Sequence, residues 1–238
     1  MLVKTKAIVI SALKYGEADL IVKIYTESDG LKTYLLRGIL KSRKGKLRTA
    51  MFQPATQLEI EANHKNKGNL ESIREAKVLH PYTTLHTDIS KTGIVMFLSE
   101  MLRGAIQEEE ANPALYAYLE NAFLWLDHHA HVANFHLLFL LKLTRYLGFY
   151  PDENHEELPF FNMETGMFQE HDEHYCIEGD SLQLLKKLMV TGFDGLTALK
   201  LNHARRNAFV ETLLLYFDLH LQGFKRPRSL EILSGLYH

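Results

Sequence analysis

A run of basic side chains with no acidic neighbour is the strongest chemical signal in the sequence. Residues 37–48 contain six cations and no Asp or Glu: Arg37, Lys41, Arg43, Lys44, Lys46 and Arg48. Gly38 and Gly45 give this stretch backbone freedom, so it can follow an irregular row of phosphates. Attachment to a phosphate backbone needs little more than such cations. The stretch therefore predicts a loop that binds nucleic acid.

Alternating Lys and Tyr residues precede this loop. If Ser28-Asp29-Gly30 closes a hairpin, Lys23 and Tyr25 share one face with Lys32 and Tyr34. The opposite face then fills a barrel with Leu20, Val22, Ile24, Leu31, Thr33 and Leu35. Aromatic rings stack on unpaired bases while ammonium groups hold phosphates, so the Lys and Tyr face predicts single-strand binding. The alternative is a solvated face whose tyrosines pack on neighbouring side chains.

A metal site is the next chemistry that the residue types allow. His171, His174 and Cys176 fall within six residues and could supply three zinc ligands, with His155 or an acid as the fourth. Their spacing matches no standard structural zinc pattern, which favours a polar loop with a small buried thiol. The second cluster, His128, His129 and His131, follows a predicted helix, where capping explains it as well as coordination does. We expect no metal and no other cofactor.

Signatures of catalysis fail on inspection. The stretch from Gly38 to Lys46 superficially resembles a phosphate-binding P-loop, but six residues instead of four separate its glycines. Leu47 also stands where a Ser or Thr would hold magnesium. The sequence contains no G-x-S-x-G elbow, no dinucleotide-binding glycine fingerprint and no H-E-x-x-H motif. We therefore predict a protein that is not an enzyme.

Five short strands must position the basic residues. Alternating or β-branched-rich runs cover residues 3–11, 20–26, 31–36, 55–62 and 70–78, with turn residues between them. Five strands in 80 residues leave no room for crossover helices, which indicates a small antiparallel barrel. The five-stranded OB fold is the commonest such barrel that binds oligonucleotides.

From about residue 85 the apolar pattern changes to a helical period of 3.6 residues. Residues 146–185 interrupt this pattern with ten acids and no Lys or Arg. We predict an α+β protein with an OB-fold nucleic-acid-binding domain over residues 1–80 and a helical domain over residues 81–238. The helical domain includes an acidic irregular insert over residues 150–180.

Composition sets the class and suggests a charged partner. The 238 residues are 46% hydrophobic and 24% charged, as in soluble globular proteins, and the one cysteine fits a reducing, cytoplasmic location. No apolar run is long enough to span a membrane. The net charge of -2 hides an asymmetry. Residues 1–80 hold 15 Lys and Arg against 8 Asp and Glu, whereas residues 81–238 hold 12 Lys and Arg against 21 Asp and Glu. Either the basic end meets a polyanion or the charges are scattered and solvated.

Several motifs in order resemble the bacterial recombination mediator family RecO. They lie near both ends and in the middle of the chain: Tyr15-Gly16-Glu17-Ala18-Asp19, Lys41-Ser42-Arg43, Gln53-Pro54, Leu147-Gly148-Phe149-Tyr150-Pro151 and Arg228-Ser229. The resemblance implies an OB domain followed by helices. It also implies a DNA repair protein that binds single- and double-stranded DNA and anneals complementary strands. Such a protein works with RecR to load RecA recombinase onto DNA coated by single-strand binding protein.

The resemblance also frames three open questions. Many family members carry a four-Cys zinc module where this chain has only Cys176, so apolar packing must replace the metal if the module's fold persists. Docking of the acidic C-terminal tail of single-strand binding protein requires a local basic pocket. The candidates are Lys142 with Arg145, Lys186 with Lys187, and Lys200 with Arg205 and Arg206, of which we favour the first pair. The alternative for each is a solvated face or an ion pair with the acidic insert. The alternatives to DNA repair are an OB-fold RNA-binding or translation-associated protein, and an adaptor that binds no nucleic acid.

Overall fold

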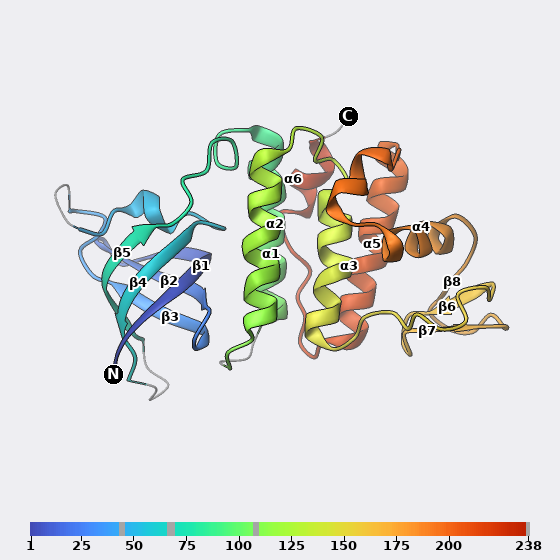
Figure 1. Cartoon of the computed structure of the whole chain (residues 1–238), viewed down its shortest axis with the longest axis horizontal. Coiled ribbons are helices and arrows are strands. Elements are labelled where there is room, and N and C mark those ends of the chain that lie inside the picture. Colours follow the sequence, from blue (N-terminus) through green and yellow to red (C-terminus); the bar gives the residue numbers. More distant parts are fainter. Residues whose placement is uncertain (43–45, 66–69, 107–109, 237–238) are drawn as a thin grey trace. The chain divides into compact units, whose positions relative to one another are not determined.

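The computed structural model describes residues 1–42, 46–65, 70–106 and 110–236. Two compact units make up the chain, Met1–His128 and His129–His238 (Figure 1). Each unit has its own buried apolar side chains. The predicted domain boundary at residue 80 stays a prediction, because a division of the chain by compact packing does not test where one domain ends and the next begins.

A five-stranded antiparallel sheet forms the first part of unit 1. Its strands are β1 (Leu2–Tyr15), β2 (Asp19–Thr26), β3 (Gly30–Leu36), β4 (Gln57–Asn63) and β5 (Ser72–Val78). In space they follow the order β3-β2-β1-β4-β5, and a short 3-10 helix, η1 (Thr49–Phe52), lies between β3 and β4. The predicted fold class, strands in an OB-type arrangement followed by helices, is confirmed.

The two edge strands meet at one point. Tyr34 of β3 and Glu71 form an isolated parallel bridge. The Leu35 amide donates to the Glu71 carbonyl at 3.0 Å, and the Glu71 amide donates to the Thr33 carbonyl at 2.9 Å. These bonds curl the sheet around an apolar core, which includes Val22, Ile24, Tyr34, Leu36, Phe52, Leu58 and Ile60.

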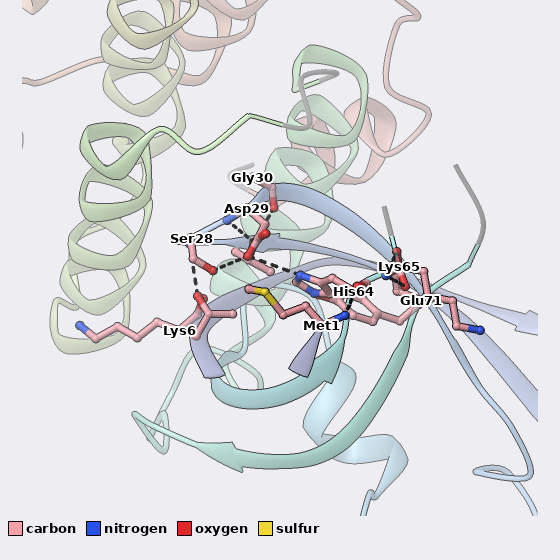
Figure 2. A network of polar contacts seen from close by, with 11 residues as sticks. Met1, Lys6, Ser28, Asp29, Gly30, His64, Lys65 and Glu71 are labelled. Atoms are coloured by element: carbon pink, nitrogen blue, oxygen red, sulfur yellow. Dashed lines mark hydrogen bonds and ion pairs between the residues drawn. The ribbon is translucent and has the colours of Figure 1, made fainter. Parts of the chain in front are cut away.

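A buried histidine ties the loops beside this bridge together (Figure 2). The Tyr34 hydroxyl lies 2.7 Å from His64 Nε2, and His64 Nδ1 lies 3.4 Å from the Asp29 carboxylate. Both carboxylate oxygens of Glu71 accept a hydrogen bond from the Lys65 amide. The β2–β3 turn and the segment that follows β4 are thus joined through side chains inside the barrel.

Two helices complete unit 1, α1 (Ile89–Ala105) and α2 (Pro113–His128). Helix α1 packs against β1, which is why both faces of β1 are buried from Ala7 to Ile10. Asp127 of α2 accepts hydrogen bonds from the amides of Thr83, Thr84 and Leu85, which lie just before α1. Lys91 of α1 donates to the Asp127 carbonyl at 2.7 Å. These polar contacts fix the two helices to one another.

Unit 2 is built around helix α3 (Phe135–Leu147). Its helices are α3, α4 (Gly179–Val190), α5 (His203–His220) and α6 (Leu230–Gly235), with a 3-10 helix η2 (Phe193–Ala198). Helix α3 contacts α4, α5 and η2, and Phe135 to Leu141 are all buried, as expected for a central helix. Gly148 ends α3 in the left-handed conformation, with φ of 86°.

The acidic insert of unit 2 contains a small sheet. Strands β6 (Phe160–Asn162), β7 (Met167–Gln169) and β8 (Cys176–Ile177) are antiparallel in the order β7-β6-β8. Phe161, Met163 and Phe168 are buried, and Phe161 also contacts Tyr216 of α5. Apolar packing therefore holds this insert together. In the described part of the chain, no helix has both the length and the apolar character needed to cross a membrane.

Candidate nucleic-acid interface

Four cations of the predicted basic loop are exposed. Arg37, Lys41, Lys46 and Arg48 all reach solvent between β3 and η1. Arg43 and Lys44 lie outside the described residues. Within the described residues, Arg37 and Arg48 have no ion pair. Such cations can contact phosphates without first giving up a protein partner.

The start of this loop is anchored on the β1–β2 turn. The Gly38 amide donates to the Asp19 carboxylate at 2.7 Å, and the Leu40 amide donates to the Ala18 carbonyl at 2.9 Å. Gly38 has a φ of 68°, which L side chains rarely adopt. These bonds bring the cations of the loop next to the tip of the β1–β2 hairpin.

Two acids hold cations of the loop. Lys41 lies 3.2 Å from the Glu17 carboxylate, and Lys46 pairs with Glu75 of β5. The hydrogen bond and the positive charge of Lys46 lower the pKa of Glu75 from its usual value. Both carboxylates contact these cations in the way that a phosphate oxygen would.

The predicted Lys and Tyr face is wrong, because the hairpin is one residue out of the expected register. Thr26 pairs with Gly30, so Lys32 lies opposite Ile24 and Tyr34 lies opposite Val22. A shift of one residue moves every side chain of a strand to the other face. Lys32 and Tyr34 are consequently buried on the core side of β3, so Lys32 cannot hold a phosphate and Tyr34 cannot stack on a base.

Tyr25 does lie on the outward side of the sheet, but it is also buried. It pairs with Ile8 of β1, on the sheet surface opposite the barrel core. Its hydroxyl donates to the Asn112 carbonyl at 3.5 Å, just before α2. Lys23, two residues earlier on the same face, is half-exposed and stays available to a ligand. Burial therefore removes Tyr25 from the predicted set of binding residues and leaves Lys23.

A different aromatic residue occupies the outward face near the loop. Cross-strand pairing puts Leu13 opposite Ile21 and Tyr15 opposite Asp19, on the face that carries Lys23. Leu13 and Tyr15 are each 55% exposed. We call this outward surface of β1, β2 and β3 the hairpin face. Sequence reasoning missed Tyr15, because its place beside the cations depends on the contact between Asp19 and Gly38, which are far apart in the sequence.

Charge is balanced on the other half of the sheet. The outward positions of β4 carry Glu59 and Glu61, which pair with Lys4 and Arg74 at 3.1 and 2.9 Å. Lys6 lies opposite Glu59 in the sheet and also contacts Glu120. A polyanion gains little from cations that carboxylates already neutralise. The hairpin face and the adjoining basic loop are the better surface for nucleic acid, because Arg37 and Arg48 have no ion pair within the described residues.

The predicted partner-binding cations of unit 2 gather around one ring. Arg145 lies 3.9 Å and Lys142 lies 5.5 Å from the centre of the Tyr150 ring. Lys142 also donates to the Met189 carbonyl at 2.6 Å, near the end of α4. Arg145 pairs with Glu153 of the insert and is more exposed than Lys142. Both cations therefore have intramolecular partners, and Arg145 is the easier one for a ligand to reach.

The residues considered as metal ligands do not converge. Among the residues described by the structure, no group of three or more His, Cys, Asp or Glu side chains is arranged to hold a metal ion. Cys176 accepts a hydrogen bond from Gln169 at 3.3 Å, and the ring of His174 contacts Tyr175. His128 lies in the last turn of α2, where a positive charge suits the helix dipole.

Comparisons with known proteins agree along the whole chain. The family model described as recombination protein O N terminal matches residues 1–82, and the model described as recombination protein O C terminal matches residues 86–230. The chain is 56% identical to DNA repair protein RecO of Christiangramia forsetii and 49% identical to that of Flavobacterium johnsoniae. It is 35% identical to DNA repair protein RecO of Phocaeicola vulgatus. All three matches cover 100% of both chains.

Proposed function

The chain belongs to the RecO family of DNA repair proteins, and we propose that it works by binding single- and double-stranded DNA through its barrel. Bound in this way, it anneals complementary strands and helps to load RecA recombinase onto DNA coated by single-strand binding protein. It acts in the cytoplasm by binding rather than by catalysis. Its proposed protein partners are RecR and the acidic C-terminal tail of single-strand binding protein.

The exposed cations between β3 and η1 are the observation that carries this proposal. Arg37, Lys41, Lys46 and Arg48 follow one another along a segment fixed at its start to the β1–β2 turn. A phosphate backbone is a row of regularly spaced negative charges and suits such a series of cations. Lys23 adds a further cation on the hairpin face. Arg43 and Lys44 belong to the proposed set by sequence alone.

The tail of single-strand binding protein requires a separate, cationic and apolar site. On unit 2, Arg145 and Lys142 supply the positive charge, and the ring of Tyr150 supplies an apolar surface. The exposed side chain of Val190 follows Met189, whose carbonyl accepts the Lys142 hydrogen bond. An acidic peptide with apolar side chains would exchange the Glu153 carboxylate for its own at Arg145.

Titration of labelled DNA over a salt series tests the proposal. If about six cations meet phosphates, the plot of log affinity against log salt for single strands has a slope of about -4. The variant Lys41→Gln, Lys46→Gln, Arg48→Gln removes three cations, so we expect weaker binding and a slope less steep by about 2. A matched control, Lys4→Gln, Lys6→Gln, Arg74→Gln, removes three cations that pair with carboxylates on the charge-balanced half of the sheet and should leave the slope unchanged.

Three outcomes would contradict this assignment. Equal losses in both triple variants would mean that the cations between β3 and η1 have no special role. Tighter binding to RNA than to DNA of the same sequence would favour the RNA-binding alternative, because basic side chains alone do not distinguish the two. Failure of the wild-type protein to retain any nucleic acid at low salt would favour an adaptor.

A further inference from the structure

An exposed apolar patch lies directly beside the cations of the proposed DNA site. Leu13 and Tyr15 are each 55% exposed, and Leu40 is 36% exposed. In the described part of unit 1, Tyr15 is the one aromatic residue among the large exposed hydrophobic side chains. Leu13 and Tyr15 lie two residues apart on one face of β1, and neighbouring exposed apolar side chains commonly mark a binding surface.

The backbone holds Tyr15 at the tip of the β1–β2 hairpin. Gly16 follows it with a φ of 59°, and the turn returns to Asp19, which pairs with Tyr15 across the hairpin. Asp19 is engaged by the Gly38 amide, so the side of the hairpin that carries Tyr15 adjoins the start of the basic loop. The Tyr15 ring is thus exposed at a turn that hydrogen bonds hold in place, and not at a free chain end.

The Tyr15 ring is unoccupied as far as the described residues show. Within the described residues, Tyr15 makes no side-chain hydrogen bond and no aromatic contact. Its backbone turn, by contrast, is fixed by the bond from Leu40 to Ala18 and by the ion pair of Lys41 with Glu17. A fixed position combined with an unused ring is suited to stacking on a flat ligand.

The neighbouring charges identify that ligand. Arg37 and Lys41 are exposed near the patch, Lys23 is half-exposed on the same face as Tyr15, and further cations follow along the loop. A single DNA strand has both a row of phosphates for these cations and unpaired bases for the ring, whereas a duplex hides the faces of its bases. An acidic peptide fits less well, because it concentrates its charge in one cluster instead of repeating it along the loop.

We propose that Tyr15 stacks on a base of the bound strand and makes this surface favour unpaired DNA over duplex DNA. The inference rests on the proposed function, since it assumes that the basic loop holds DNA. It adds a selectivity that phosphate contacts cannot supply, because both forms of DNA present phosphates.

Anisotropy titrations of the full chain with three labelled probes test this role. The probes are an oligonucleotide of unpaired thymidines, a duplex of equal length, and an abasic strand with the same number of phosphates. For Tyr15→Ala we expect about tenfold weaker binding of the thymidine strand and less than about twofold change for the duplex and the abasic strand. Tyr15→Phe keeps the ring and should bind like wild type. Met96→Ala, an exposed truncation on α1, serves as the control.

The readouts separate this role from the proposed function. An unchanged salt slope in Tyr15→Ala, together with the selective loss, supports stacking. Equal losses for all three probes, or no loss for the thymidine strand, would overturn it while leaving DNA binding by the cations intact. Loss of binding to an acidic, apolar peptide alone would identify a peptide site and also overturn it. If wild type binds none of the probes, the proposed function itself is wrong.

Discussion

The hydroxyl of Tyr34 and the imidazole of His64 lie 2.7 Å apart inside the barrel, where the edge strands meet. Burial, followed by the nearby charges of Asp29 and Glu71, raises the pKa of Tyr34 well above its usual value. The phenol therefore stays protonated and can donate to His64 Nε2. Tyr34 contributes to closing the barrel and is not available to nucleic acid.

Replacement of Tyr34 by Phe should cost stability without affecting DNA binding. The change leaves a buried ring nitrogen of His64 without its partner, which costs about 1–3 kcal/mol. We expect a lower free energy of unfolding in urea and an unchanged affinity for a single strand. A loss of DNA affinity in a fully folded Tyr34→Phe protein would mean that this residue does reach the ligand.

Removal of the acids that hold the loop cations should strengthen DNA binding. In Glu17→Gln and Glu75→Gln, Lys41 and Lys46 no longer have carboxylate partners. Exposed ion pairs are weak, so we expect an affinity increase of no more than about fivefold for each variant at low salt. Glu59→Gln, which frees Lys4 on the balanced half of the sheet, is the matched control. A similar increase in that control would point to a general charge effect.

Asp127 should make unit 1 sensitive to strong acid. Burial raises the pKa of this carboxyl, but hydrogen bonds from the amides of Thr83, Thr84 and Leu85 outweigh burial and lower the pKa to about 2. Because the pKa is lower in the folded state, the stabilisation is complete above about pH 4 and is lost as the pH falls towards 2. Asp127→Asn should be less stable at pH 7 and lose less stability between pH 4 and 2. If wild type and Asp127→Asn lost the same free energy of unfolding between pH 4 and pH 2, this prediction would be wrong.

His136 should make unit 2 lose stability in milder acid. Burial, with a smaller effect of the Arg206 charge, lowers the pKa of His136 to about 3. The folded state thus keeps this ring neutral while the unfolded chain binds a proton below about pH 6.5, so stability falls by about 1.4 kcal/mol per pH unit below that value. In His136→Gln this dependence should be absent. Urea midpoints measured from pH 7 to pH 5 would reveal the difference, and equal slopes would refute it.

Arg145 should matter for binding of an acidic tail peptide and not for binding of DNA. Arg145→Gln removes the more exposed cation beside Tyr150 without disturbing the bond from Lys142 to the end of α4. We expect weaker peptide binding by calorimetry and normal DNA titrations. Lys187→Gln, an exposed cation on α4, is the control. If Lys187→Gln weakened peptide binding and Arg145→Gln did not, the peptide site would instead lie on α4 near Lys187.

Local patterns in the sequence were enough to predict the fold class. Alternation over residues such as Gln57 to Glu61 marks a strand with one buried face, and five such strands in 80 residues leave few arrangements besides a small barrel. The basic loop over residues 37–48 could also be predicted without the structure, because that prediction depends only on its positive charge and its lack of acids. The acidic insert and the family resemblance were equally visible in the order of residues.

The tertiary structure decided which side chains a ligand can reach. The number of residues in the β2–β3 turn set the register, and one residue of difference exchanged the buried and exposed faces for Lys32 and Tyr34. Tyr25 was covered by packing near Asn112, far away in the sequence. Tyr15 gained its place beside the cations through the bond between Asp19 and Gly38. Periodicity reports which residues alternate, but contacts between distant segments determine which of the two faces meets solvent.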